Sequence, residues 1–332
     1  MVLGKNAGNP DGLPSILTWQ KQKLTFENRG SDNFCHPKLK RRTKMKKTYL
    51  NAAISIFCWS TVATVCKILL ADLNSMQLLW MNSLIAGVFL FIINLATGNF
   101  KSYSYKLKDY LAMMLIGIPG TFFYYIFYYS GTDILPASQA FIINYLWPIM
   151  SVLFACLILG EKLTVKKIIA IIISFLGVVV VVGDALKDLN INAIMGALFC
   201  ILGAVSYGLF TALNQKKNYN KSMTLMVSYL TTLVLTTIIN GVKGDLFLPA
   251  TSQVAGFLWN GIFAVAIANT CWVNALKSGD TAKVSNLAYI TPFVSGIWTY
   301  IFLNEKITAS SVVGLGIIIL GIFIQLKDKK KA

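Results

Sequence analysis

Two long apolar stretches of the chain each carry a row of polar side chains at the spacing of one helical face. The rows are Ser60, Thr64 and Lys67 in one stretch and Tyr207, Thr211 and Asn214 in the other, and a shift of 147 residues superposes them. Polar side chains within a membrane helix normally face protein or water, so both rows are predicted to face a shared cavity that binds a small polar molecule. In the alternative, structural interpretation the hydroxyls bond back to their own helix and Lys67 extends to the surface.

A second pair of segments combines aromatic side chains with proline. The sequence Asn144-Tyr145-Leu146-Trp147-Pro148 recurs in altered form as Ala288-Tyr289-Ile290-Thr291-Pro292. A proline inside a helix removes a backbone donor and frees the carbonyl one turn earlier, so Pro148 and Pro292 are predicted to kink two helices and leave a polar carbonyl within each. Interrupted helices of this kind often build substrate sites in membranes, although a kink can also serve packing alone.

Aromatic and amide side chains near these prolines are candidates for ligand contacts. Asn144 and Trp147 can share one face, and Asn269 and Trp272 have i, i+3 spacing on another apolar stretch. Aromatic walls with a few hydrogen-bonding groups suit a flat or amphipathic ligand. The tyrosines at 124, 125, 128 and 129 are predicted instead to form part of an aromatic belt at the membrane surface.

Several classes of chemistry lack the residues they need. No apolar stretch has a carboxylate or a histidine at its centre, which disfavours a buried acidic site for cationic drugs. The sequence has no HExxH zinc motif and no GxxxxGK phosphate loop, so an enzyme is not expected. The cysteines form no CxxC pair, and no metal or other cofactor is predicted.

Composition indicates that the positioning elements are membrane helices. Hydrophobic residues make up 56% of the chain and charged residues 13%, whereas soluble domains carry roughly 25% charged residues. Ten apolar stretches are long enough to span a bilayer, and their length favours helices over barrel strands. They lie at 48–70, 76–97, 109–130, 136–159, 166–183, 192–214, 222–240, 252–276, 282–303 and 310–326. The predicted fold is therefore an all-α polytopic membrane protein with ten transmembrane helices.

The lysines predict how these helices are oriented. With the N-terminus inside, the cytoplasmic loops and C-terminal tail hold 15 lysines and the opposite loops hold 3, counted without the N-terminal tail. This bias places both termini in the cytoplasm. It also explains the net charge of +17 without a nucleic-acid partner. The expected location is the plasma membrane.

A repeat divides the chain into two halves. Residues 137–182 recur in diluted form at 281–326, a shift of 144 positions without a gap. Five helices per copy force the two copies to insert with opposite orientation, so we expect an inverted repeat of residues 46–183 and 192–326. Residues 1–44 are predicted to form a polar, basic and disordered tail. In the alternative interpretation, Met45 is the natural start of the protein. Residues 327–332 are predicted to form a basic cytoplasmic tail.

The repeated motifs resemble a known family. The segments Gly160-Glu161-Lys162-Leu163-Thr164 and Asn304-Glu305-Lys306-Ile307-Thr308, each after a proline-containing stretch, are similar to paired EamA domains of the drug/metabolite transporter superfamily. The segments with Pro148 and Pro292 are similar to bacterial aromatic-amino-acid exporters. The resemblance implies a central cavity between the halves and transport by alternating exposure.

We therefore expect a transporter that exports a small neutral or zwitterionic metabolite, with an amino acid as the first candidate. Lys67 would attract a carboxylate, Trp147 and Trp272 would contact the apolar part, and Asn144, Tyr145, Tyr207 and Tyr289 would supply hydrogen bonds. The alternatives are uptake of an anionic or nucleotide-linked sugar, or a membrane scaffold without transport. The expected partners are the lipid bilayer and the substrate, with the chain acting as a monomer or a homodimer.

Overall fold

The computed structural model of the protein describes residues 37–183, 190–217, 219–278, 284 and 287–328, and all regular secondary structure in these ranges is helical. Contacts divide the chain into residues 1–47 and residues 48–332. Helix α2 begins at Pro37, so the last eight residues of the predicted tail are helical. Residues 1–36 of that tail lie outside the described residues.

The first repeat contains α2 (Pro37–Ser60), α3 (Val62–Leu70), α4 (Ser75–Ala96), α5 (Asn99–Ser102), α6 (Leu107–Gly117), the π-helix η1 (Ile118–Phe123), α7 (Tyr124–Ile134), α8 (Ala137–Asn144), α9 (Trp147–Leu159) and α10 (Val165–Val181). The second contains α12 (Ile191–Lys216), α13 (Lys221–Lys243), α14 (Thr251–Leu258), the π-helix η2 (Trp259–Ile267), α15 (Ala268–Ser278), the 3₁₀ turn η3 (Ala288–Ile290), α17 (Thr291–Leu303) and α18 (Ala309–Asp328).

Each of the ten predicted stretches overlaps a helix in the described residues. Within the described ranges, seven continuous helical segments are long and apolar enough to cross a membrane. The other three stretches correspond to α10, to η3 with α17, and to α18, which are shorter. The chain is thus an all-helical protein with many apolar helices, and the count of ten spans stays a prediction.

Polar residues at the ends of the apolar segments fix where the helices begin. The Asn74 side chain accepts hydrogen bonds from the backbone N–H groups of Met76 and Gln77 at the start of α4. Asn220 accepts one from Met223 at the start of α13. These bonds satisfy N–H donors that have no partner within the helix. An N–H group left without a partner would be costly near hydrocarbon.

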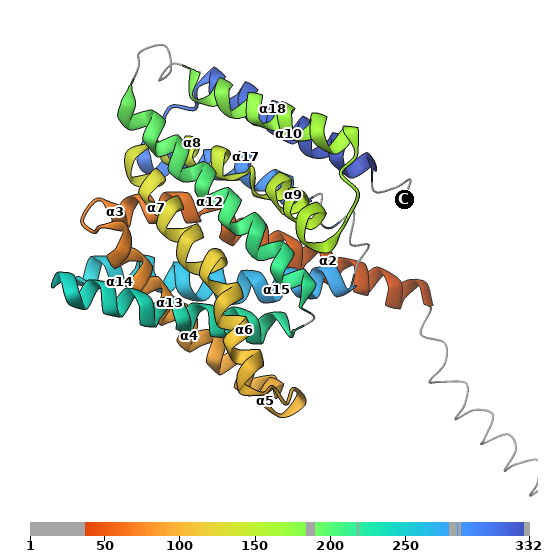
Figure 1. The fold of residues 1–332 in the computed structure, drawn as a ribbon, viewed down its shortest axis with the longest axis vertical. Coiled ribbons are helices and arrows are strands. Elements are labelled where there is room, and N and C mark those ends of the chain that lie inside the picture. The colour runs from red at the N-terminus through yellow and green to blue at the C-terminus, as the bar shows by residue number, and fades with distance from the viewer. Residues whose placement is uncertain (1–36, 184–189, 218, 279–283, 285–286, 329–332) are drawn as a thin grey trace, which may run out of the picture. The chain divides into compact units, whose positions relative to one another are not determined.

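The two repeats pack through equivalent pairs of helices. Helix α10 lies against α18 and α4 against α13, and each of these pairs joins one element to its counterpart in the other repeat. Helix α8 lies against α17, which is the counterpart of α9. Figure 1 shows α10 and α18 running side by side along one edge of the helical unit. The Ser174 hydroxyl of α10 donates to the carbonyl of Ile318, which lies 144 residues later. This pairing supports the duplication, and the inverted orientation of the copies stays a prediction.

Small residues allow the close contact between α10 and α18. A Cβ atom at Gly177 would lie 2.8 Å from the backbone oxygen of Gly314, and one at Gly321 would lie 2.7 Å from that of Ala170. In membranes such contacts supply the packing that the hydrophobic effect cannot. These small residues therefore serve contacts within one chain.

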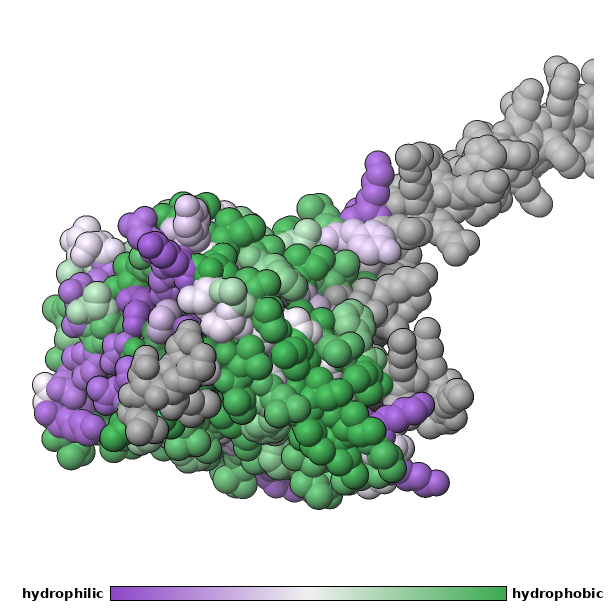
Figure 2. All heavy atoms as spheres, turned by 90° about the horizontal axis from the view of Figure 1, so that it is seen from above, coloured by the Kyte–Doolittle hydropathy of each residue, from purple (hydrophilic) through white to green (hydrophobic). Residues whose placement is uncertain are grey.

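Apolar side chains cover much of the surface of the helices. In the view of Figure 2 a broad hydrophobic band occupies the centre of the face, while hydrophilic side chains gather mainly toward its left edge. Exposed residues of this kind include Leu157, Ile172 and Phe302. An exposed apolar band of this extent is what a lipid-facing surface requires.

The contact between α10 and α18 gives a direct test of stability. A Cβ atom at Gly314 would lie 2.4 Å from Cγ2 of Val181, whereas nothing lies within 4 Å of one at Gly316, two residues along the same helix. Overpacking of this kind costs about 1–3 kcal/mol, so Gly314→Ala should lower the melting temperature in detergent by several degrees. Gly316→Ala is the control and should leave it unchanged or higher. Equal melting temperatures for the two variants would contradict the contact.

A central aromatic cavity as candidate functional site

A cavity of about 200 Å³ lies among helices of both repeats. Its walls are aromatic and amide side chains, and none of the lining residues that belong to the described ranges is charged. The lining residues are Trp59, Val62, Leu79, Asn82, Tyr124, Tyr125, Tyr128, Tyr129, Phe141, Asn144, Tyr145, Trp147, Tyr207, Tyr229, Asn260, Ala264, Val265, Asn269, Trp272, Ala288 and Thr291. Such a cavity suits an amphipathic molecule that carries few or no uncompensated charges.

The structure brings half of the predicted binding residues together in this cavity. They are Asn144, Tyr145, Trp147, Tyr207, Asn269 and Trp272. The ring of Trp147 on α9 meets that of Tyr207 on α12 edge to face, with centroids 5.2 Å apart. This contact joins the first repeat to the second at the wall of the cavity.

The other predicted residues lie outside the lining. Ser60 donates to the carbonyl of Phe57 and accepts a hydrogen bond from the Trp298 indole, and Thr211 donates to the carbonyl of Tyr207. Thr64 and Asn214 each have a buried side-chain oxygen without a partner in the described residues. Tyr289 packs its ring against Tyr145 and Phe323. The two rows of polar residues therefore contribute one member, Tyr207, to the cavity.

Lys67 has a well-defined structural environment. Its ammonium group donates to the carbonyls of Thr132, Asp133 and Leu135 at distances of 2.7, 2.7 and 3.0 Å. These carbonyls lie at the C-terminal end of α7, where backbone acceptors lack helical partners and the helix dipole is negative. Because all three N–H groups of the ammonium are engaged, Lys67 acts in this conformation as a cap for α7.

The tyrosine run of α7, interpreted from sequence as a membrane-surface belt, lines the cavity instead. The belt interpretation is wrong because Tyr128 is 1% exposed and Tyr129 is 3% exposed. The rings of Tyr124 and Tyr128 are stacked one turn apart with centroids separated by 6.0 Å. The i, i+4 spacing of these tyrosines was the available signal, since it puts each pair on one helical face.

Two asparagines that the sequence did not single out also belong to the site. The side-chain amide of Asn82 on α4 donates to the Tyr129 hydroxyl at 3.0 Å, and that of Asn260 in η2 donates to the Cys66 thiol at 3.4 Å. Both residues are buried. Each keeps its side-chain oxygen without a partner in the described part of the chain. Isolated asparagines in apolar stretches were the only sequence signal, and it does not reveal which helices meet.

Each repeat widens into a π-helix at the level of the cavity. Segment η1 precedes Tyr124 in the first repeat, and η2 contains Asn260 and Ala264 in the second. A π-helix disturbs the regular i to i−4 ladder, so nearby carbonyls can accept other donors. The Trp59 indole donates to the Ala264 carbonyl at 3.1 Å. This bond fixes one aromatic wall of the cavity against η2.

Both prolines lie where a helix is interrupted. Helix α8 ends at Asn144 and α9 begins at Trp147, with Pro148 in its first turn, and α17 begins at Thr291 directly before Pro292. Pro292 cannot donate to the carbonyl of Ala288 four residues earlier. The Tyr145 hydroxyl donates to this carbonyl instead. The interruption in one repeat is therefore completed by a side chain from the other.

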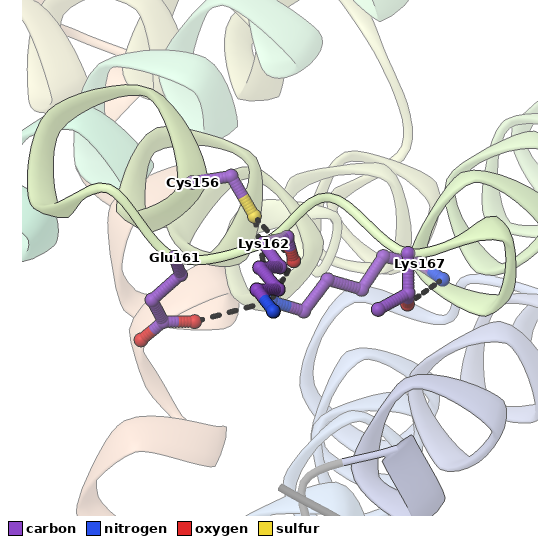
Figure 3. A network of polar contacts seen from close by, with 5 residues as sticks. Cys156, Glu161, Lys162 and Lys167 are labelled. Atoms are coloured by element: carbon purple, nitrogen blue, oxygen red, sulfur yellow. Dashed lines mark hydrogen bonds and ion pairs between the residues drawn. The ribbon is translucent and has the colours of Figure 1, made fainter.

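The two copies of the Glu-Lys-x-Thr motif make different contacts. Glu161 pairs with the buried ammonium of Lys167 at 3.1 Å, and that ammonium also donates to the Lys162 carbonyl and the Cys156 sulfur (Figure 3). Glu305 instead accepts hydrogen bonds from the backbone of Ala137, at 2.6 Å, and from Ser138. It thereby caps the start of α8 across the repeats.

A metal-dependent site has no candidate in the described part of the chain, where no group of three His, Cys, Asp or Glu side chains could hold an ion. The described cysteines are all free thiols. What the cavity offers is aromatic surface and neutral hydrogen-bonding groups. Those groups can bind a molecule, and none of them has the arrangement of a nucleophile with its base.

A helical membrane fold with a central cavity between two repeats defines a protein of the transporter class. The EamA-like transporter family model matches residues 46–183 and 194–326. The chain therefore belongs to the EamA-like transporter family and is a multi-pass membrane protein. Members of this family are transporters and not enzymes.

Comparisons with individual proteins agree with this assignment. The chain is 28% identical to the uncharacterized transporter YvbV of Bacillus subtilis over 295 residues, which are 86% of this chain and 93% of that protein. It is 25% identical to the aromatic amino acid exporter YddG of Ancylobacter novellus over 181 residues, which are 54% of this chain and 63% of the exporter. One crystal structure aligns with a TM-score of 0.62 and 21% identity over 86% of this chain and 99% of that chain, which supports the fold.

The hydrogen bond between Tyr145 and Ala288 should contribute to stability. Tyr145→Phe removes this hydrogen bond and leaves the half-buried carbonyl of Ala288 with the Thr291 N–H as its donor, at a cost of about 0.5–1.5 kcal/mol. We expect a clearly lower melting temperature in detergent. Tyr289→Phe is the matched control, since its ring packs against Tyr145, and it should have a smaller effect. A melting temperature for Tyr145→Phe equal to that of the native chain would refute the role of this bond.

The environment of Lys67 makes a second prediction. Lys67→Met keeps the length of the side chain but removes three hydrogen bonds to the end of α7, so the melting temperature should fall. The loss should correspond to about 1–2 kcal/mol because part of this ammonium is exposed to solvent. Lys306→Met, at an exposed lysine, is the control. If Lys67→Met instead leaves stability unchanged and weakens substrate binding, Lys67 contacts substrate and not α7.

Proposed function

We propose that the protein exports a small neutral or zwitterionic metabolite, and that this metabolite is an amino acid with an apolar side chain. The observation that carries the proposal is an uncharged, aromatic cavity that lies between the two repeats of an EamA-like transporter. The side chain of such a substrate would pack on Trp147 and Tyr207, whose rings already form a perpendicular pair. The name of the aromatic amino acid exporter among its relatives supports the same substrate class and direction.

The chemistry of the lining also separates this proposal from the alternative substrate class. A nucleotide-linked sugar carries several negative charges, and a site for it needs cations at short distance. Within the part of the chain that the structure describes, the cavity lining contains no lysine or arginine. A neutral or zwitterionic molecule places no uncompensated net charge in this environment, so it is the class that the cavity favours.

We further propose that substrate passes through the cavity by alternating exposure to the two sides of the plasma membrane, with both chain termini in the cytoplasm. The distribution of lysines supports this orientation, because 15 of them lie in loops and the tail on the predicted inner side and 3 on the outer side. Each repeat contributes a π-helix and a proline interruption close to the lining. Irregular helices of this type can rearrange around a fixed site.

Counterflow in proteoliposomes tests the proposal. Vesicles loaded with unlabelled phenylalanine should accumulate labelled phenylalanine when they contain the native chain. Trp147→Ala should raise the KM about 10-fold, because loss of one buried aromatic contact costs about 1–2 kcal/mol. Trp80→Ala is the matched control, since Trp80 lies on α4 outside the lining and bonds to Thr237. Absence of counterflow for every amino acid, as expected for a scaffold, would refute the proposal.

A further inference from the structure

One corner of the cavity combines two neighbouring indole rings with an amide oxygen. Trp59 of α2 and Trp272 of α15 lie with ring centroids 5.2 Å apart and planes tilted by 59°. Asn269 lies one turn before Trp272 on the same helix, and all three residues line the cavity. Their arrangement joins π-electron surface to a hydrogen-bond acceptor.

Hydrogen bonds to the backbone hold this corner in place. The Trp59 indole N–H is engaged by the Ala264 carbonyl at 3.1 Å, so the ring contributes its surface to the cavity and not its donor. The side-chain amide nitrogen of Asn269 donates to the Val265 carbonyl at 2.7 Å. With the nitrogen anchored to the helix, the oxygen of Asn269 is the group left to accept a hydrogen bond.

The same pattern extends to other asparagines of the lining. The side-chain nitrogens of Asn82, Asn144 and Asn260 each donate to a neighbouring protein atom. Their side-chain oxygens have no partner among the described residues. Each of these nitrogens keeps a second N–H, but the three oxygens are wholly unpartnered within the described ranges, and their lone pairs favour a ligand group with several donors.

We propose that Trp59, Asn269 and Trp272 form an uncharged site for the ammonium group of the substrate. A cation is attracted to the face of an aromatic ring, most strongly to tryptophan, and an ammonium group supplies three hydrogen-bond donors. Among the described residues, the lining contains no cation that would repel it. This inference rests on the proposed function and assigns the amino group of the transported molecule to a specific corner of the cavity.

Binding of three related molecules tests the assignment. Thermal stabilisation of the purified full-length chain should be measured with phenylalanine, with phenethylamine, which lacks the carboxylate, and with 3-phenylpropionate, which lacks the ammonium group. We expect phenylalanine and phenethylamine to stabilise the chain and 3-phenylpropionate to have no effect at equal concentration. Stabilisation by 3-phenylpropionate equal to that by phenethylamine, or none by phenethylamine, would overturn the assignment.

Variants at Asn269 and Trp272 locate the site. Asn269→Leu and Trp272→Leu should each raise the Kd for phenethylamine by about 10-fold. Asn269→Asp should lower that Kd, because it adds a counter-charge, and a gain in affinity cannot result from misfolding. Thr270→Val is the matched control, since Thr270 lies on the same helix outside the lining and bonds to the Ala266 carbonyl. An unchanged Kd in all three site variants would overturn the assignment.

Counterflow measured on the same preparations separates this inference from the proposed function. Transport of phenylalanine that survives in Asn269→Leu and Trp272→Leu with an unchanged KM would refute the ammonium site and leave the transporter proposal standing. Binding of phenethylamine that depends on Asn269, without counterflow of any amino acid, would refute transport of amino acids and support the ammonium site.

Discussion

A backbone carbonyl or N–H group that lacks a partner in hydrocarbon costs several kcal/mol, and this constraint runs through the whole structure. It restricts the membrane segments to helices, and it also decides what happens where a helix is interrupted. Pro292 removes the donor for the Ala288 carbonyl, and the Tyr145 hydroxyl replaces it. The Trp59 indole bonds in the same way to the Ala264 carbonyl of a π-helix. The irregular backbone that shapes the cavity is therefore held by the side chains that line it.

The two repeats pack through equivalent helices, and residues at which their sequences differ line the cavity. Helices α10 and α18 use equivalent glycines, 177 and 321, to pack closely at the interface of the repeats. At the cavity the two copies differ, because Trp147 corresponds to Thr291 and Asn144 to Ala288 in the repeat register. One half therefore supplies an aromatic and amide group where the other supplies a hydroxyl and a methyl group. An asymmetric cavity of this kind can distinguish the two ends of a small molecule.

In the described part of the chain, charged side chains lie at the ends of helices and not in the cavity lining. Lys67 binds the last carbonyls of α7, and Glu305 binds the first N–H groups of α8. The short loop between α7 and α8 is therefore bound at both of its ends. Each charge meets the end of the helix dipole that favours it. This arrangement keeps the full charges away from the uncharged lining. It also connects the loop between α7 and α8 to both repeats.

The sequence by itself determined the fold class, because hydrocarbon imposes long apolar stretches on any helix within it. It indicated the family through the proline interruptions and the repeated Glu-Lys-x-Thr motif. It also indicated Trp147, Tyr207, Asn269 and Trp272, since polar and aromatic residues stand out against an apolar helix. The tertiary structure decided which of the candidates meet. The Lys67 ammonium binds carbonyls at the end of α7, and tyrosines of α7 are hydrogen-bonded to Asn82 and Asn144. Periodicity fixes the face of a helix on which a residue lies, but only the packing of helices far apart in sequence fixes whether that face meets lipid, a neighbouring helix or a cavity.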